Sequence, residues 1–244
     1  MKRIGIIGGM SYESTIRYYT ELNRLVNERA GGLNSAEIFL RSVNFENYHA
    51  WMREGDWEWI GIQLGREAKA LRYGCKCDYV VIATNTMHKI ADLVERYVLF
   101  PLDGLHPFVH VGDCIAEDCR RRNFNRVALL GTKFTMTEDF LVNRISRSGV
   151  TVGNIHSEIL SDAGVINEID NIIFEELCHG DASNESLRFF RNLTDTLVQK
   201  EGFDGIILGC TELGEAFHRA NIPDYRLVDS AEVHIQKLAE LCLS

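Results

Sequence analysis

A regular alternation of short apolar runs and longer amphipathic runs constrains this chain most strongly. The short runs are rich in Ile, Val and Leu and predict strands, whereas the longer runs have apolar residues at about every third or fourth position and predict helices. Continuous apolar strands between helices are typical of parallel sheets that helices cover on both faces. We therefore predict an α/β fold. The clearest strands are expected at 3–7, 79–83, 126–130 and 205–208.

The two halves of the sequence resemble one another. The segment 3–8 is similar to 126–131, which lies 123 residues later, and 81–86 is similar to 207–212, which lies 126 residues later. Leu102-Asp103 and Val228-Asp229 share the spacing of 126. We infer two similar lobes, each a parallel sheet flanked by helices, related by a pseudo-twofold axis with the active site between them. The first lobe is expected to comprise 1–112 and 225–244, and the second 113–224.

Charge and hydropathy exclude several classes of partner. The 26 Lys and Arg residues against 35 Asp and Glu residues give a net charge of −9, which argues against nucleic acid and anionic membranes as partners. The longest apolar run has about five residues, whereas a bilayer-spanning helix needs about 20. The apolar stretch near the N-terminus is also too short for a signal peptide. We expect a cytoplasmic protein without a membrane partner.

Seven cysteines are scattered along the chain without a Cys-x-x-Cys pair. This spacing argues against a zinc site and against a disulfide framework. Most of these thiols are expected to be buried and inert. Cys210 differs because it ends a predicted strand and precedes a predicted helix start, where the positive end of the helix dipole lowers the pKa of a thiol.

Ligands of open parallel sheets bind beyond the carboxyl ends of the strands. Hydroxyls, an amide and backbone N–H groups at helix starts form an anion-binding surface there, and a small carboxylate fits it. If the two lobes face each other, the strand-end segments meet in one cleft. Four segments qualify: Gly8-Gly9-Met10-Ser11, Ala83-Thr84-Asn85-Thr86, Gly131-Thr132-Lys133-Phe134-Thr135 and Gly209-Cys210-Thr211-Glu212.

Each of these segments also has a purely structural interpretation. Gly8 and Gly9 permit a tight turn, and Thr84 and Thr211 are good helix caps. A dinucleotide site is disfavoured, because the glycines near the N-terminus do not form G-x-G-x-x-G, and no Walker A sequence occurs. Cys210 on its own is more often a buried structural residue.

The histidines carry weaker signals. His106 and His110 have the i, i+4 spacing of metal ligands, but Pro107 argues against the helix that this spacing requires. His88 follows the Thr84 segment, where it is either near the site or in a cap or surface role.

Four motifs in order resemble the aspartate/glutamate racemase superfamily of cofactor-independent amino-acid racemases. The resemblance covers nearly the whole chain, and each motif alone is only moderately specific. The motifs are Ile6-Ile7-Gly8-Gly9-Met10-Ser11, Thr84-Asn85-Thr86-Met87-His88, Leu129-Leu130-Gly131-Thr132-Lys133-Phe134-Thr135-Met136 and Ile207-Leu208-Gly209-Cys210-Thr211-Glu212-Leu213.

The resemblance implies racemisation of an amino acid, aspartate, glutamate or a broader set, without PLP and without a metal. In such racemases a catalytic Cys ends corresponding strands of the two lobes. The resemblance puts the second catalytic residue at Cys210 and the first at Thr84, as in a subset of the family with Thr at this place. It leaves assembly as a homodimer open. The implied substrate-binding residues are Gly9, Met10, Ser11, Asn85, Thr86, Thr132, Lys133, Thr135, Thr211 and Glu212, with Glu212 near the substrate amine.

Thr in place of a catalytic Cys has a kinetic consequence. A hydroxyl has a far higher pKa than a thiol, whose reference value is about 8.5. Thr84 can therefore donate a proton but is a poor base, and Cys210 should deprotonate one enantiomer well while the reverse direction is slow. The equilibrium between enantiomers is unaffected.

Substrate specificity and reaction type stay open at this level. The segments 44–49 and 177–180 contain no Arg or Lys to hold a distal carboxylate of the substrate. Lys133 and His179 are the candidates to take the place of such a residue. A single active Cys also fits a decarboxylase or a cis–trans isomerase of small dicarboxylates. A non-catalytic carboxylate-binding relative is the alternative from another class of protein.

Overall fold

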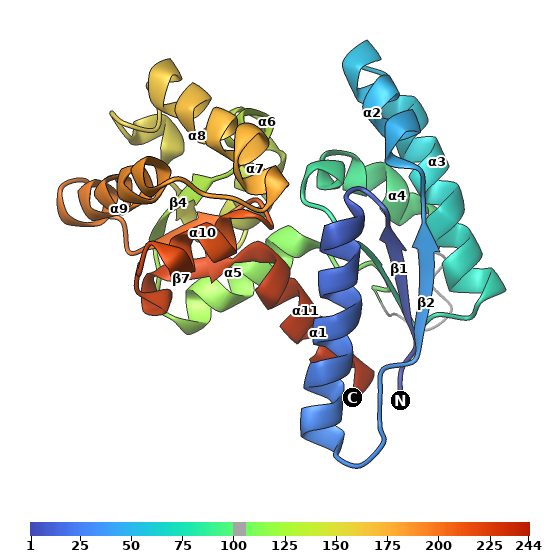
Figure 1. Ribbon diagram of the computed structural model, residues 1–244. Coiled ribbons are helices and arrows are strands. Elements are labelled where there is room, and N and C mark those ends of the chain that lie inside the picture. Colours follow the sequence, from blue (N-terminus) through green and yellow to red (C-terminus); the bar gives the residue numbers. More distant parts are fainter. Residues whose placement is uncertain (100–105) are drawn as a thin grey trace. The chain divides into compact units, whose positions relative to one another are not determined.

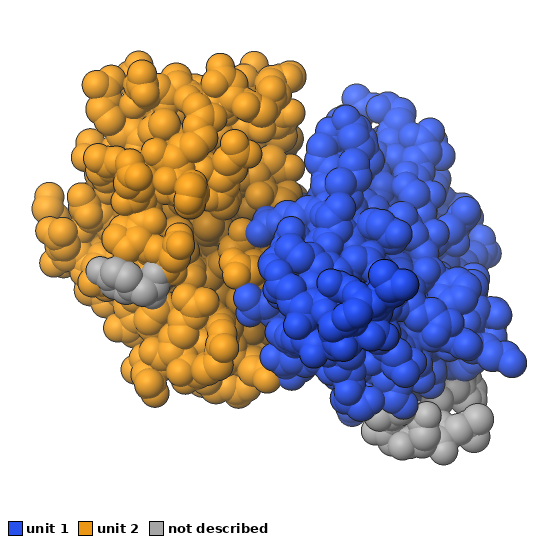
Figure 2. Space-filling view, turned by 60° about the horizontal axis from the view of Figure 1, so that its bottom comes forward, with its two compact units in different colours: residues 1–111, 234–244 blue, residues 112–233 orange. Residues whose placement is uncertain are grey.

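A computed structural model describes residues 1–99 and 106–244. The chain divides into two compact units, coloured separately in Figure 2. The first comprises Met1–Val111 and His234–Ser244, and the second comprises Gly112–Val233. Each unit contains a parallel sheet flanked by helices (Figure 1), as the sequence predicts.

The first unit is built on a three-stranded sheet in the order β2-β1-β3. Ile4 in the central strand pairs with Ile38 on one side and Tyr79 on the other. Its strands are β1 (Ile4–Gly8), β2 (Ile38–Ser42) and β3 (Tyr79–Ile82), and its helices are α1 (Tyr12–Ala30), α2 (Phe45–Glu54), α3 (Trp57–Lys69), η1 (Ala70–Gly74), η2 (Thr86–Ile90) and α4 (Ala91–Val98).

Successive side chains of these strands point to opposite faces of the sheet. Ile7, Val80 and Ile82 belong to one apolar cluster with buried residues of α3 and α4, such as Leu64 and Val94. The helices α3 and α4 approach closely because glycines line their contact. A Cβ on Gly61 would lie 2.5 Å from Leu93, and one on Gly65 would lie 2.4 Å from Tyr97.

The second unit contains a four-stranded sheet in the order β5-β4-β6-β7. Its strands are β4 (Arg126–Leu130), β5 (Thr151–Val152), β6 (Gly205–Leu208) and β7 (Leu227–Asp229). Its helices are α5 (Val111–Arg121), α6 (Lys133–Thr137), α7 (Asp139–Ser146), η3 (Asn154–His156), α8 (Ala163–Glu175), η4 (Leu177–His179), α9 (Asn184–Gln199), α10 (Leu213–Arg219) and η5 (Asp224–Arg226), and α11 (Ser230–Cys242) follows β7.

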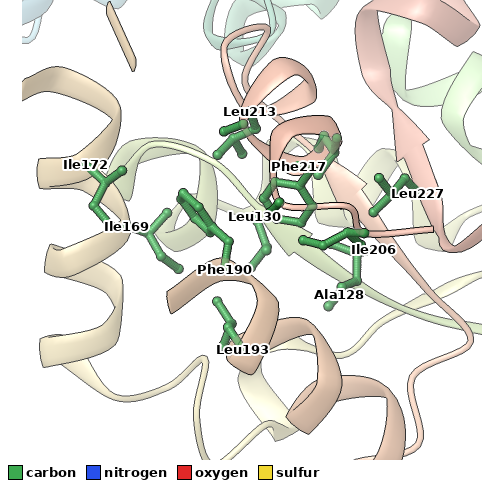
Figure 3. Packing of buried hydrophobic residues seen from close by; sticks show 14 of the residues in the cluster. Ala128, Leu130, Ile169, Ile172, Phe190, Leu193, Ile206, Leu213, Phe217 and Leu227 are labelled. Carbon is green, nitrogen blue, oxygen red and sulfur yellow. The ribbon is translucent and has the colours of Figure 1, made fainter. Parts of the chain in front are cut away.

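Buried aromatic and aliphatic side chains from β4, β6 and three helices form the core of this unit. Figure 3 shows Phe190 of α9 and Phe217 of α10 among aliphatic residues of the strands. The two aromatic rings lie 5.1 Å apart between centroids. This core packs α8, α9 and α10 against one face of the sheet. The packing thereby fixes the position of β6 and of the residues 209–212 that follow it.

The internal repeat is visible in strand pairing. Ile7 of β1 pairs with Ile82 of β3, and Leu130 of β4 pairs with Leu208 of β6, which reproduces the sequence spacings of the first two repeat segments. The third repeat segment differs. Leu102-Asp103 lies outside the described residues, and the observed counterpart of the β6–β7 pairing is a parallel bridge between Val80 and Phe108.

Two sequence expectations differ from the structure. The sequence predicts that 225–233 belong to the first lobe, but these residues contain β7, which pairs with β6 in the second unit. The apolar run 98–102 also predicts a strand, but Val98 ends α4, Leu99 follows this helix, and 100–102 lie outside the described residues. The helix α2 was missed, although Asn44 caps its start and Gly55 adopts the left-handed conformation at its end. Over the described ranges, no helix is both long and apolar enough to cross a membrane.

Candidate functional site

The predicted binding residues of the first unit lie at one edge of its sheet. Gly9, Met10 and Ser11 follow β1, and Thr84, Asn85 and Thr86 follow β3. Because β1 and β3 are adjacent and parallel, both segments emerge at the carboxyl end of the sheet.

Internal hydrogen bonds hold the segment after β1. Gly9 has a φ of +92°, and a Cβ there would lie 2.3 Å from the Val43 carbonyl oxygen, so glycine is required at this turn. The Gly9 N–H donates to the Thr15 hydroxyl at 2.8 Å. The Ser11 hydroxyl caps α1 by accepting from the Ser14 N–H at 3.3 Å. These internal hydrogen bonds therefore hold the turn that follows β1.

The Thr84 segment is also fixed through its backbone. The Ala83 N–H donates to the Ile7 carbonyl at 2.9 Å, and the Ser14 hydroxyl donates to the Ala83 carbonyl at 3.0 Å. The helix η2 has Asn85 as its N-terminal cap residue, without a capping side-chain bond. The Thr84 side chain is thus not the cap of this helix, and the residue is partly exposed.

In the second unit, the predicted residues again follow two adjacent parallel strands. Thr132, Lys133 and Thr135 follow β4, and Cys210, Thr211 and Glu212 follow β6. The Thr132 hydroxyl caps α6 by accepting from the Thr135 N–H at 3.4 Å.

Lys133 forms hydrogen bonds with two residues of α8. Its ammonium donates to the Asn167 side chain at 3.0 Å, and its backbone N–H donates to the Asp170 carboxylate at 2.6 Å.

Glu212 is the hydrogen-bonding partner of both polar side chains that precede it. Its Oε2 accepts from the Cys210 thiol at 2.8 Å and from the Thr211 hydroxyl at 2.7 Å. Thr211 is therefore engaged with Glu212, and α10 begins without a capping side-chain bond. Glu212 is therefore the acceptor toward which the Cys210 thiol proton points.

The electrostatic environment of Cys210 differs from the expectation that a helix start lowers its pKa. Burial is the largest influence, and the negative charge of Glu212 adds to it, so that the pKa of the Cys210 thiol is raised well above its usual range. The seven-residue helix α10 starts only at Leu213 and does not outweigh these effects. The side chain is accordingly a thiol that donates to Glu212.

The sequence analysis does not predict Cys178 as a site element. This exposed thiol in η4 lies close enough to Cys210 to raise the pKa of that thiol further. The surface role considered for His88 is wrong, because this side chain is buried behind Thr84 and contacts two further buried histidines, His110 and His234. The metal interpretation of His106 and His110 gains no support, since no metal-binding group of His, Cys, Asp or Glu occurs within 1–99 and 106–244.

These parallel sheets, each with polar segments at its carboxyl edge, have the fold of the α/β racemases. The profile of the Asp/Glu/hydantoin racemase family matches residues 7–238, and the chain therefore belongs to this family. A Yersinia pestis protein named for the Asp/Glu racemases superimposes with a TM-score of 0.87 and 34% identity, with 100% of each chain covered. An aspartate racemase homologue from Pyrococcus horikoshii OT3 gives 0.84 and 34% over 100% of each chain.

A more distant relative shares the fold alone. The Picrophilus torridus aspartate racemase gives a TM-score of 0.61 at 18% identity, with 99% of this chain and 94% of that chain covered. Family membership supports a racemase-type isomerisation of a small molecule.

Proposed function

We propose that this protein racemises an amino acid, aspartate, glutamate or a related one, without PLP. Cys210 removes the Cα proton from one face, and Thr84 serves the other face. The observation that carries this proposal is the hydrogen bond from the Cys210 thiol to the Glu212 carboxylate, which pairs a nucleophilic atom with a base.

The raised pKa of Cys210 requires a step that activates the thiol. An amino-acid substrate carries an ammonium group, and a cation beside Cys210 and Glu212 stabilises the thiolate. In the proposed sequence, the Cys210 proton passes to Glu212 as substrate binds. The thiolate then takes the Cα proton and leaves a carbanion conjugated with the substrate carboxylate.

Reprotonation from the other face completes inversion. The Thr84 hydroxyl donates a proton to Cα and regains one from solvent, and Glu212 releases to solvent the proton that it took from Cys210. In the opposite direction Thr84 must act as the base, which is unfavourable because an alcohol has a far higher pKa than a thiol. The kcat of the proposed enzyme therefore differs between the two enantiomers, whereas kcat/KM is the same in both directions because the equilibrium constant is one.

The test is incubation with single enantiomers of aspartate, glutamate and other common amino acids, followed by chiral chromatography. Formation of the opposite enantiomer supports the proposal. Release of CO₂ identifies a decarboxylase instead, and calorimetric binding without conversion identifies a non-catalytic relative. Maleate is included as a dicarboxylate, and its conversion to fumarate without amino-acid racemisation overturns the proposal.

A further inference from the structure

A cluster of buried histidines lies behind the Thr84 segment. This histidine cluster comprises His88 on η2, His110 after the Phe108 bridge and His234 on α11, and each is at most 3% exposed. The His88 ring lies 4.6 Å from the His110 ring and 5.9 Å from the His234 ring, between centroids. The proposed proton transfer does not use any of these three side chains.

The two hydrogen bonds of His88 assign its tautomer. Its Nδ1 lies 2.9 Å from the Thr84 carbonyl oxygen, and its Nε2 accepts from the Val111 N–H at 3.3 Å. A carbonyl can only accept and a backbone N–H can only donate. His88 therefore carries its proton on Nδ1 and donates it to Thr84, while the lone pair of Nε2 faces Val111.

His234 is held in the opposite tautomer. Its Nε2 lies 3.0 Å from the Val109 carbonyl oxygen and must donate to it. Its Nδ1, 2.8 Å from the Tyr18 oxygen, is thus left to accept the phenolic proton. His234 is therefore ordered by its bonds to the backbone and to Tyr18, whereas His88 contacts the Thr84 backbone by a hydrogen bond.

The surroundings keep His88 neutral. Burial lowers its pKa well below the usual histidine range, and the neighbouring His110 and His234 lower it further. A proton on Nε2 would also point at the Val111 N–H. The donor to Thr84 and the acceptor for Val111 are consequently both present at neutral pH.

We propose that His88 is a positioning residue for Thr84: its Nδ1–H holds the Thr84 carbonyl and thereby sets the direction of the Thr84 hydroxyl. This inference rests on the proposed function. A bond to the backbone of the reacting residue matters because a displacement of about 1 Å can cost about 100-fold in rate. His88 itself does not touch the substrate and exchanges no proton with it.

The role of His88 can be isolated by measuring how the Cα carbanion divides between deuteration with retention and deuteration with inversion in deuterated water. Deuterium incorporation with retention reports on Cys210, and incorporation with inversion reports on Thr84. The ratio of inversion to total exchange is internal to each protein sample, so partial unfolding does not change it. A loss of positioning lowers this ratio while exchange with retention continues.

Paired substitutions separate the two nitrogen atoms of His88. His88→Asn retains a donor near the Nδ1 position, and His88→Gln retains an acceptor near the Nε2 position. We expect His88→Gln to lower the inversion ratio by about 10- to 100-fold and His88→Asn to keep it within about threefold of the parent. His234→Asn is the matched control, because it disturbs the same cluster without removing the bond to Thr84.

An unchanged ratio in folded His88→Gln overturns the proposal, as does an equal loss in His234→Asn. A second measurement is independent of catalysis. The ¹⁵N NMR spectrum of the histidine-labelled parent should show His88 protonated on Nδ1, and protonation on Nε2 overturns the proposal. If the parent neither exchanges nor inverts any amino acid, the proposed function fails, and the ¹⁵N spectrum still tests the assigned His88 bond.

Discussion

Thr84 and Cys210 occupy equivalent positions in the two sheets. Each lies two residues beyond the end of a strand that pairs with the central strand, β3 for Thr84 and β6 for Cys210. The preceding residues are held alike, since Ala83 donates its N–H to β1 at 2.9 Å and Gly209 donates to β4 at 2.6 Å. The repeat therefore presents a hydroxyl in one unit at the place where it presents a thiol in the other.

Thr84→Cys should make the two directions of racemisation more alike. A thiol at this position can act as a base, and proton transfer by a positioned group contributes about 10²–10⁴-fold. The kcat of the slower direction should gain more than that of the faster one, as measured by initial rates at saturating concentrations of each enantiomer.

Thr84→Ser, which keeps the hydroxyl, is the control and should retain the original asymmetry. Thr84→Ala should lose inversion while exchange of the Cα proton with deuterated water persists. Equal acceleration of both directions by Thr84→Cys would show that the second proton comes from another group.

Cys210→Ser should lower turnover by about 10²–10⁴-fold or more, because it replaces the main base with an alcohol. Iodoacetamide should inactivate the parent faster as the pH rises, because it reacts with the thiolate, and bound substrate should block its access. Cys178→Ser is the matched control from the same unit and should remain active. A fully active Cys210→Ser protein would refute the assigned role of this thiol.

Glu212→Gln should shift the pH dependence of kcat/KM. The negative charge of Glu212 contributes to the raised pKa of Cys210, so its removal lowers that pKa and moves the ascending limb of the profile to lower pH. The maximal rate should fall at the same time, because the acceptor of the thiol proton is lost. Glu215→Gln, an exposed neighbour on α10, should leave the profile unchanged. A limb that stays in place in Glu212→Gln would contradict this account.

Acid should destabilise the protein through His88. In the folded state the pKa of His88 lies well below 6.5, so below that pH the unfolded chain binds a proton that the folded chain does not. The free energy of unfolding should fall on acidification by up to about 1.4 kcal/mol per pH unit from this group.

Urea unfolding at pH 7 and pH 5 measures this change. His88→Asn should reduce the pH dependence, and His218→Asn, at an exposed histidine, should not. An identical pH dependence in the parent and His88→Asn would exclude His88 as the source.

Gly65→Ala should destabilise the first unit although alanine favours helices by about 1 kcal/mol. The new Cβ would lie 2.4 Å from the Tyr97 ring, and overpacking costs about 1–3 kcal/mol. Gly74→Ala is the control because its Cβ would meet no atom within 4 Å. Urea midpoints compare the two variants, and a Gly65→Ala protein as stable as Gly74→Ala would show that α4 shifts without cost.

The amino-acid sequence was enough to predict the α/β class, the strands that carry the candidate site and the half-chain repeat. These features are local, because strand and helix periodicity and turn residues act over a few neighbouring positions. It also pointed to Thr84 and Cys210, because each directly follows a recognisable strand. The short helix α2 was not predicted, because a few residues give only a weak helix signal. The sheet to which β7 belongs was not predicted either, since the propensities of a few residues cannot decide between two sheets.

The environment of Thr84 and Cys210 depends on how distant segments of the chain pack together. The bond between Tyr18 and His234 joins residues 216 positions apart, and no local pattern indicates that they meet behind Thr84. The raised pKa of Cys210 likewise depends on burial by the packed second unit and on the orientation of Glu212. Burial and hydrogen-bond partners are properties of side chains brought together from distant segments, and therefore protonation and positioning follow from the fold.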